Sequence, residues 1–170
     1  MMSRFLLNVG FLLLLSPSVS FSEQFNGRII HVADGDTVTL LTESKQKIRI
    51  RISGIDAPEK AQPYGNRSKQ NLERLAHSKD AFADCPKKDK YKRHVCKVLV
   101  DNIDVGLQQI RDGFAWWYRA YSNEQSAEAR TAYENAEIAA SKAAIGLWKD
   151  DSSVPPWEWR KSQKRLRQQQ

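Results

Sequence analysis

The chain has 170 residues, and 27 Lys and Arg against 20 Asp and Glu give it a formal charge of +7. At about 150 residues per domain this length predicts one domain. A hydrophobic content of 41% is enough to build a core, which excludes a wholly disordered chain. Two cysteines are too few for a four-thiolate zinc site. The positive charge favours a polyanionic partner.

Residues 1–22 have the pattern of a secretory signal peptide. Arg4 supplies the positive start, residues 5–15 are almost entirely apolar, and the small residues that follow suit cleavage after Ser20 or Ser22. The apolar stretch, roughly 11 residues, is shorter than the ~20 that span a bilayer, so a cleaved leader is favoured over a membrane anchor. We therefore expect an exported protein, either periplasmic or secreted.

The first half of the remaining chain predicts strands with one helix between them. The stretch 47–53 alternates isoleucines with Lys, Arg and Ser, which indicates a half-buried strand with a basic outer face. The other expected elements are two strands over 27–41 around the Asp34-Gly35-Asp36 turn, a helix over 66–77 and a strand over 95–100.

The second half predicts helices. Asp104 can cap a helix that Gly113 ends, and Ser122 with Gln125 fits a capping box for a longer helix ending near Gly146. Strands first, with helices inserted and appended, argue for a small β-barrel with helices on one side rather than a doubly wound fold. We expect this domain to span 23–149. Residues 150–170 read as a Pro-containing linker and a flexible basic tail.

Four short segments carry the residues suited to catalysis: 34–37, Arg51, 56–59 and 89–93. Each is ordinary alone, since Asp-Gly is above all a turn signal. Together they form a chemical set. Clustered carboxylates suit a hard divalent cation such as Ca²⁺, and two arginines suit a phosphate. A further carboxylate beside a metal ligand can orient or deprotonate a water.

The order and spacing of these motifs, followed by Gly146-Leu147-Trp148, resemble the staphylococcal nuclease-like (thermonuclease, micrococcal nuclease) family. The resemblance runs from about Arg28 to Trp148. It implies an α+β fold that is mainly β-barrel, a five-stranded OB-fold barrel with three helices. It also implies Ca²⁺-dependent hydrolysis of DNA and RNA with little sequence specificity, leaving 3′-phosphate ends.

By this resemblance, Asp36 and Asp56 would be carboxylate ligands of Ca²⁺, and the backbone carbonyl of Ala57 a further ligand. The family often has Thr at the position of Ala57, and a carbonyl ligand tolerates that change. Glu59 would act on the attacking water. The remaining carried-over roles are phosphate binding by Arg51 and Arg93, support of the metal ligands by Asp34, and lesser substrate contacts by Lys90, Tyr91 and Tyr121.

Cys85 and Cys96 flank the 89–93 segment. In an exported protein we expect them to form a disulfide, which would stabilise the fold by roughly 3 kcal/mol and hold the segment that presents Arg93. The alternative is two free thiols. The three histidines lack zinc-ligand spacing. The aromatic segment 116–118 suits either base stacking or the core, and the basic tail either phosphate binding or a solvated end.

Two other functions are possible. An OB-fold module that binds nucleic acid without cutting it would be expected to lack catalytic positions, yet all five are present: Asp36, Arg51, Asp56, Glu59 and Arg93. A cationic protein that binds envelopes through its tail would not explain the acidic loops. We therefore expect a Ca²⁺-dependent nuclease with DNA and RNA as substrates, acting as a monomer without a stable protein partner.

Overall fold

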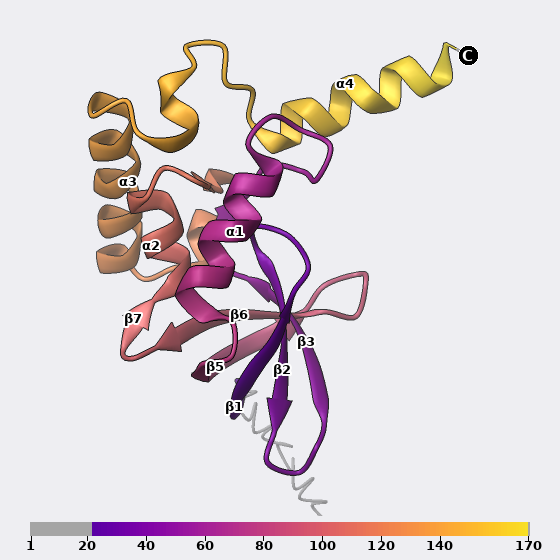
Figure 1. Cartoon of the computed structure of the whole chain (residues 1–170), viewed down its shortest axis with the longest axis vertical. Coiled ribbons are helices and arrows are strands. Elements are labelled where there is room, and N and C mark those ends of the chain that lie inside the picture. Colours follow the sequence, from indigo (N-terminus) through magenta and orange to yellow (C-terminus); the bar gives the residue numbers. More distant parts are fainter. Residues whose placement is uncertain (1–21, 170) are drawn as a thin grey trace, which may run out of the picture.

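In the computed structural model, which describes residues 22–169, a closed barrel occupies the first half of the chain. Four antiparallel pairings give the strand order β3-β2-β1-β5-β6, and a parallel pairing of β3 with β6 closes the sheet. The barrel strands are β1 (Glu23–Val32), β2 (Thr37–Thr42), β3 (Lys47–Ile52), β5 (Asp80–Lys88) and β6 (His94–Val100). The five-stranded α+β barrel is confirmed (Figure 1).

The alternation in β3 fills the barrel as the sequence predicts. Ile48, Ile50 and Ile52 are buried, whereas Lys47 and Arg49 are exposed on the opposite face. Each fully buried aliphatic side chain of this size contributes about 1.5–3 kcal/mol to folding. The isoleucines therefore fix the register of β3, because a slip by one residue would turn them to solvent.

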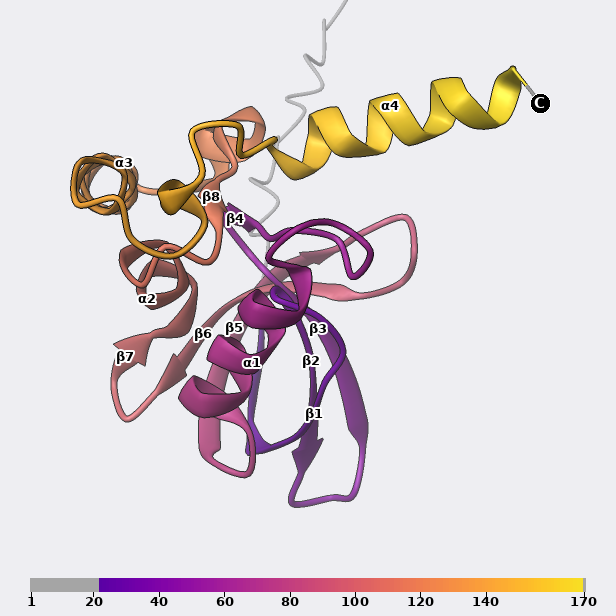
Figure 2. The same cartoon turned by 45° about the horizontal axis from the view of Figure 1, so that its top comes forward.

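Helices cover one end of the barrel (Figures 1 and 2). Asp104 caps α2 as predicted, because its side chain accepts hydrogen bonds from the backbone N–H groups of Gly106 and Leu107. The helices are α1 (Gly65–Ala76), α2 (Val105–Arg111), α3 (Ala127–Lys142) and α4 (Pro156–Gln168). The short elements are β4 (Ile55–Asp56), β7 (Ile103–Asp104), β8 (Trp116–Trp117) and two 3-10 turns, Arg119–Glu124 and Gly146–Lys149.

Three features differ from the sequence-based predictions. Strand β5 was not predicted, because its inward residues are small and its end carries Pro86 and two lysines. The capping box at Ser122 is wrong: Ser126 caps α3 through the backbone N–H of Ala129, and residues 119–124 form a 3-10 turn. The tail is not a flexible extension but contains α4, which begins with Pro156 in its first turn.

The predicted leader, Met1–Ser22, lies outside the described residues apart from Ser22. Within 22–169, no helix combines the length and apolar character needed to cross a membrane. The predicted disulfide between Cys85 and Cys96 is present and joins β5 to β6. Trp116 and Trp117 of β8 are buried, which supports the core interpretation of that segment.

Candidate active site

The turn between β1 and β2 presents Asp36 from a tightly packed backbone. A Cβ on Gly35 would lie 1.9 Å from Oγ of Ser68 in α1, so only glycine fits this approach. The Gly35 carbonyl accepts a hydrogen bond from Gln109 of α2 at 2.8 Å. Asp34 supports the turn, because its carboxylate accepts from the backbone N–H of Asp36 at 3.1 Å. The barrel and two helices together thus fix the position of Asp36.

Two predicted metal ligands converge on one arginine. Nη2 of Arg51 lies 3.1 Å from Oδ2 of Asp36 and 3.0 Å from Oδ1 of Asp56. Asp56 lies in β4, which pairs with Trp116 in β8, and its side chain is 2% exposed. The backbone N–H of Ala57 donates to Oδ2 of Asp36 at 2.9 Å. The structure therefore brings Asp36, Asp56 and Ala57 together around Arg51.

Barrel closure brings the second predicted arginine to the same place. The parallel pairing of β3 with β6 sets Arg51 beside Val95, two residues after Arg93. Nη1 of Arg93 donates to Oγ1 of Thr37 at 3.3 Å, and this hydroxyl donates to Oδ1 of Asp36 at 3.1 Å. One hydroxyl thus separates Arg93 from the carboxylate cluster.

The loop from β5 to β6 holds Arg93 in this orientation. Asp89 accepts from Nε of Arg93 at 2.7 Å and from the backbone N–H groups of Tyr91 and Arg93 at 2.9 Å. The Cys85–Cys96 disulfide joins the two strands below the loop. Burial opposes ionisation of Asp89, but these hydrogen bonds outweigh it and lower the pKa of the carboxyl. Asp89 therefore orients Arg93 as an anion.

Glu59 reaches the cluster through a residue that the sequence did not single out. Arg160 of α4 donates from Nη1 to Oε1 of Glu59 at 2.8 Å and from Nη2 to Oδ2 of Asp56 at 2.7 Å. All five predicted catalytic and carboxylate residues thus belong to one chain of contacts. It runs Arg93, Thr37, Asp36, Arg51, Asp56, Arg160 and Glu59.

The residues predicted to make lesser substrate contacts lie outside this chain of contacts. Tyr91 is 66% exposed on the β5–β6 loop, with Nζ of Lys90 5.1 Å from the centre of its ring. The guanidinium of Arg93 also lies over this ring, 5.5 Å from its centre. Tyr121 is 47% exposed and packs edge-on against Tyr118. Tyr91 therefore contacts Arg93 of the contact chain, whereas Tyr121 contacts Tyr118 and the ammonium of Lys87.

Burial makes the carboxylates costly to ionise. Burial and the nearby charge of Asp36 raise the pKa of Asp34 to about 6. Burial also raises the pKa of Asp56, although the guanidinium groups of Arg160 and Arg51 oppose this effect. Several acids in one small volume repel each other, so they need cations beside them. The arginines supply that positive charge.

The donor set has the chemistry of a hard-cation site, but it is small. Asp36 and Asp56 present oxygens to a common point, the Nη2 atom of Arg51, and oxygen ligands are those that Ca²⁺ prefers. Within residues 22–169, no group of three or more His, Cys, Asp or Glu is arranged to hold a metal ion. A Ca²⁺ ion takes about six to eight oxygens, so an ion held by these two carboxylates would need carbonyl or water oxygens as well.

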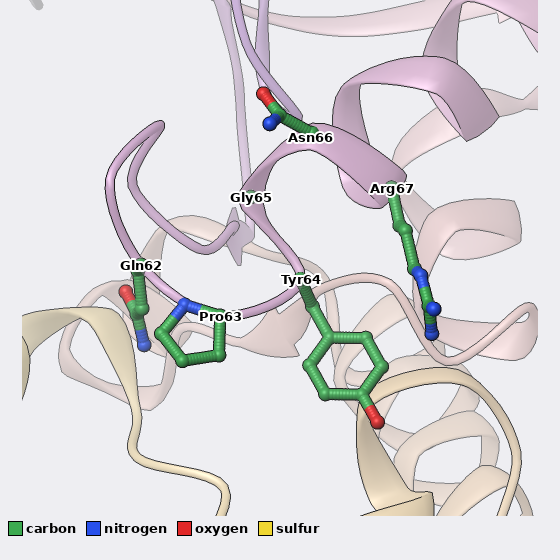
Figure 3. A pocket seen from close by; sticks show the side chains of 6 residues that line it. All are labelled: Gln62, Pro63, Tyr64, Gly65, Asn66 and Arg67. Carbon is green, nitrogen blue, oxygen red and sulfur yellow. The ribbon is translucent and has the colours of Figure 1, made fainter.

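An open hollow beside this cluster does not contain the predicted site residues. It is lined by residues 62–67 at the start of α1, and the guanidinium of Arg67 lies over the ring of Tyr64 (Figure 3). The hollow adjoins the Glu59 loop, because the side chain of Gln62 accepts from the backbone N–H of Glu59 at 3.1 Å. The candidate active site is therefore the contact chain described above, not this hollow.

The chain is similar in sequence to proteins that are named as nucleases. Residues 49–150 match a family model described as staphylococcal nuclease homologue. An uncharacterized endonuclease of Haemophilus influenzae is 33% identical over 96% of this chain and 89% of its own length. A micrococcal nuclease of Shigella flexneri is 31% identical over 88% of each chain, and an uncharacterized endonuclease of Escherichia coli O157:H7 is 34% identical over 79% of this chain and 84% of its own.

Proposed function

The chain belongs to the staphylococcal nuclease family, and we propose that it is an exported, Ca²⁺-dependent nuclease that hydrolyses DNA and RNA. Relatives over most of its length are named as nucleases, which supports nucleic-acid hydrolysis as its activity. The observation that carries the proposal is the continuous contact chain from Arg93 to Glu59. It joins phosphate-binding cations to acidic groups in one site.

In the proposed reaction the two arginines bind the scissile phosphate. Guanidinium groups match phosphate oxygens in a bidentate manner and stabilise the negative charge that develops on them. The anchoring of Arg93 by Asp89 leaves its fork pre-oriented, so little side-chain entropy is lost when substrate binds. Glu59 takes the proton of the attacking water, the P–O5′ bond breaks, and the 5′ oxygen leaves with a proton from solvent. The Glu59 side chain is 44% exposed, so solvent can reach its carboxylate.

Asp36 and Asp56 are the residues that would hold Ca²⁺, with the backbone carbonyl of Ala57. When bound, the ion supplies Lewis acidity at a phosphoryl oxygen and a template for the water. Arg51 touches both carboxylates, so it couples the occupancy of the acidic pair to the position of a phosphate-binding group. For this reason we assign to Arg51 both charge compensation of the two carboxylates and binding of the phosphate.

Export is proposed on two features of the chain. Residues 1–22 have the composition of a cleavable leader. The Cys85–Cys96 disulfide suits an oxidising compartment such as the periplasm or the medium. Little sequence specificity is expected, because the groups assigned to the substrate bind phosphates and not base edges.

The test is cleavage of plasmid DNA, single-stranded DNA and RNA by the purified protein, with Ca²⁺ or with a chelator. We expect all three substrates to be cleaved with Ca²⁺ and not with the chelator, and the products to end in 3′-phosphates. Arg93→Ala should remain folded and lose about 10²–10³ in rate. Binding of nucleic acid without cleavage would instead identify a non-catalytic module, and cleavage in excess chelator would reject the metal assignment.

A further inference from the structure

We propose that Arg160 is a positioning residue of the active site, which holds the carboxylate of Glu59 against the fixed carboxylate of Asp56. The inference rests on the proposed function, because it gives Arg160 a role through Glu59. It assigns a task to the C-terminal helix, which lies beyond the matched residues 49–150.

The geometry is that of a bridge between a rigid group and a mobile one. Asp56 is 2% exposed and receives Arg51 on Oδ1, so its position is set by the barrel. Glu59 is 44% exposed, and among residues 22–169 its carboxylate has Arg160 as its hydrogen-bond partner. Nη1 of Arg160 contacts both acids, at 3.2 Å to Asp56 and 2.8 Å to Glu59. A planar guanidinium can make such a fork, whereas a single ammonium cannot.

The Glu59 backbone is already fixed without Arg160. A Cβ on Gly65 would lie 2.1 Å from the Glu59 carbonyl oxygen, so the loop folds tightly onto the start of α1. The Glu59 carbonyl also accepts from the backbone N–H of Gln62 at 2.8 Å. What remains free is the side chain, which loses its one described hydrogen-bond partner if the guanidinium is removed. Arg160 therefore controls the position of the carboxylate and not the fold of the loop.

The base of α4 is anchored well enough to carry this arginine. The ring of Trp157 stacks on Tyr118 with centres 5.5 Å apart and planes 8° from parallel. Gln62 donates from its side chain to the Val154 carbonyl at 2.6 Å, which ties the Glu59 loop to the segment before the helix. Beyond this first turn, α4 projects away from the barrel (Figure 2). The anchored turn thus serves to place Arg160.

The role predicts a particular kinetic signature. A misplacement of about 1 Å in a catalytic group can cost 10²-fold in rate. We expect Arg160→Met, which keeps most of the apolar stem, to lower kcat by about 10- to 100-fold with KM for DNA changed less than about threefold. Arg160→Lys should recover part of the loss, because an ammonium can pair with one of the two acids.

The control is Lys161→Met, which removes the same charge from the next position of α4. Lys161 pairs with Glu158 within the helix and touches neither Asp56 nor Glu59, so the kcat of Lys161→Met should match that of the natural chain. A crystal structure of Arg160→Met without added metal gives a readout independent of activity. The Glu59 side chain should then occupy more than one conformer.

A double-mutant cycle with Glu59→Gln separates the possible outcomes. If Arg160 acts through Glu59, Arg160→Met should add little to the loss that Glu59→Gln causes. The inference is overturned if Arg160→Met lowers the rate equally in the natural chain and in Glu59→Gln. It is also overturned if Glu59 keeps a single, unmoved conformer in Arg160→Met, or if the rate rises because a guanidinium that competes with the metal has been removed. None of these outcomes removes the nuclease activity itself. Absence of any hydrolysis by the natural chain would instead reject the proposed function itself.

Discussion

Removing the Arg51 guanidinium should destabilise the fold as well as lower the activity. Its Nη2 atom lies within 3.1 Å of Asp36 and 3.0 Å of Asp56, whose side chains are 9% and 2% exposed. Breaking a buried ion pair by removing one partner typically costs about 3–5 kcal/mol, because the other charge is left uncompensated. Asp56 keeps Arg160, and Asp36 keeps the Ala57 amide. We therefore expect Arg51→Met to lose about 3 kcal/mol, the lower end of that range.

Urea unfolding in a chelator measures this loss. For an m value of about 2 kcal/mol per molar urea, the midpoint should fall by about 1.5 M. Arg49→Met is the matched control, since Arg49 lies two residues earlier on the same face of β3 but is exposed. It should change the free energy of unfolding by no more than about 0.5 kcal/mol.

Calcium should then stabilise Arg51→Met more than it stabilises the natural chain. The ion would replace the lost positive charge between Asp36 and Asp56, and a ligand at 100 times its Kd adds about 2.7 kcal/mol to the free energy of unfolding. If Arg51→Met unfolds at the same urea concentration as Arg49→Met, the carboxylates do not depend on Arg51 for charge compensation, and the electrostatic account of the site is refuted.

Three further outcomes are expected. Calorimetry should find Ca²⁺ binding weakened far more by Asp56→Asn than by Glu59→Gln; equal losses would contradict the separation of ligand from base. Replacing both Cys85 and Cys96 with alanine should lower the free energy of unfolding by about 3 kcal/mol for a loop of about a dozen residues, and an unchanged urea midpoint would show that the bridge contributes nothing. In chelator, the slope of log K for DNA binding against log salt concentration should decrease in magnitude by up to ~0.9 for each exposed α4 cation changed to glutamine: Lys164, Arg165 and Arg167. An unchanged slope would show that these residues do not contact phosphates.

Local patterns in the sequence predicted the elements that rest on local chemistry. The alternation of 47–53 predicts β3, and the side chain of Asp104 predicts the start of α2, because both depend on neighbouring residues alone. Strand β5 was missed because Ala81 and Ala83 give a weak apolar signal, although both are buried once the barrel closes. Its identity as a strand depends on pairing with β1, which lies far away in the chain, and with β6 across the 89–93 loop.

The sequence of residues 150–170 contains features that favour a helix, together with prolines that suggest a linker. Pro156 in the first helical turn, Glu158 near the start and cationic residues in the last turn all favour a helix, yet the paired prolines suggest a linker. The contact of Arg160 with Asp56 joins residues 104 positions apart. No spacing within the tail predicts it, because tertiary packing of Trp157 on Tyr118 determines where the arginine lies.

The location of a bound Ca²⁺ ion is the most direct test of the central claim, which is that acidic oxygens and guanidinium groups share one site. Anomalous diffraction from crystals of the natural chain grown with Ca²⁺ should show a peak about 2.3–2.6 Å from carboxylate oxygens of both Asp36 and Asp56. The two arginines, Arg51 and Arg93, should border the same volume. A Ca²⁺ peak elsewhere, or none at concentrations that support cleavage, would contradict the account.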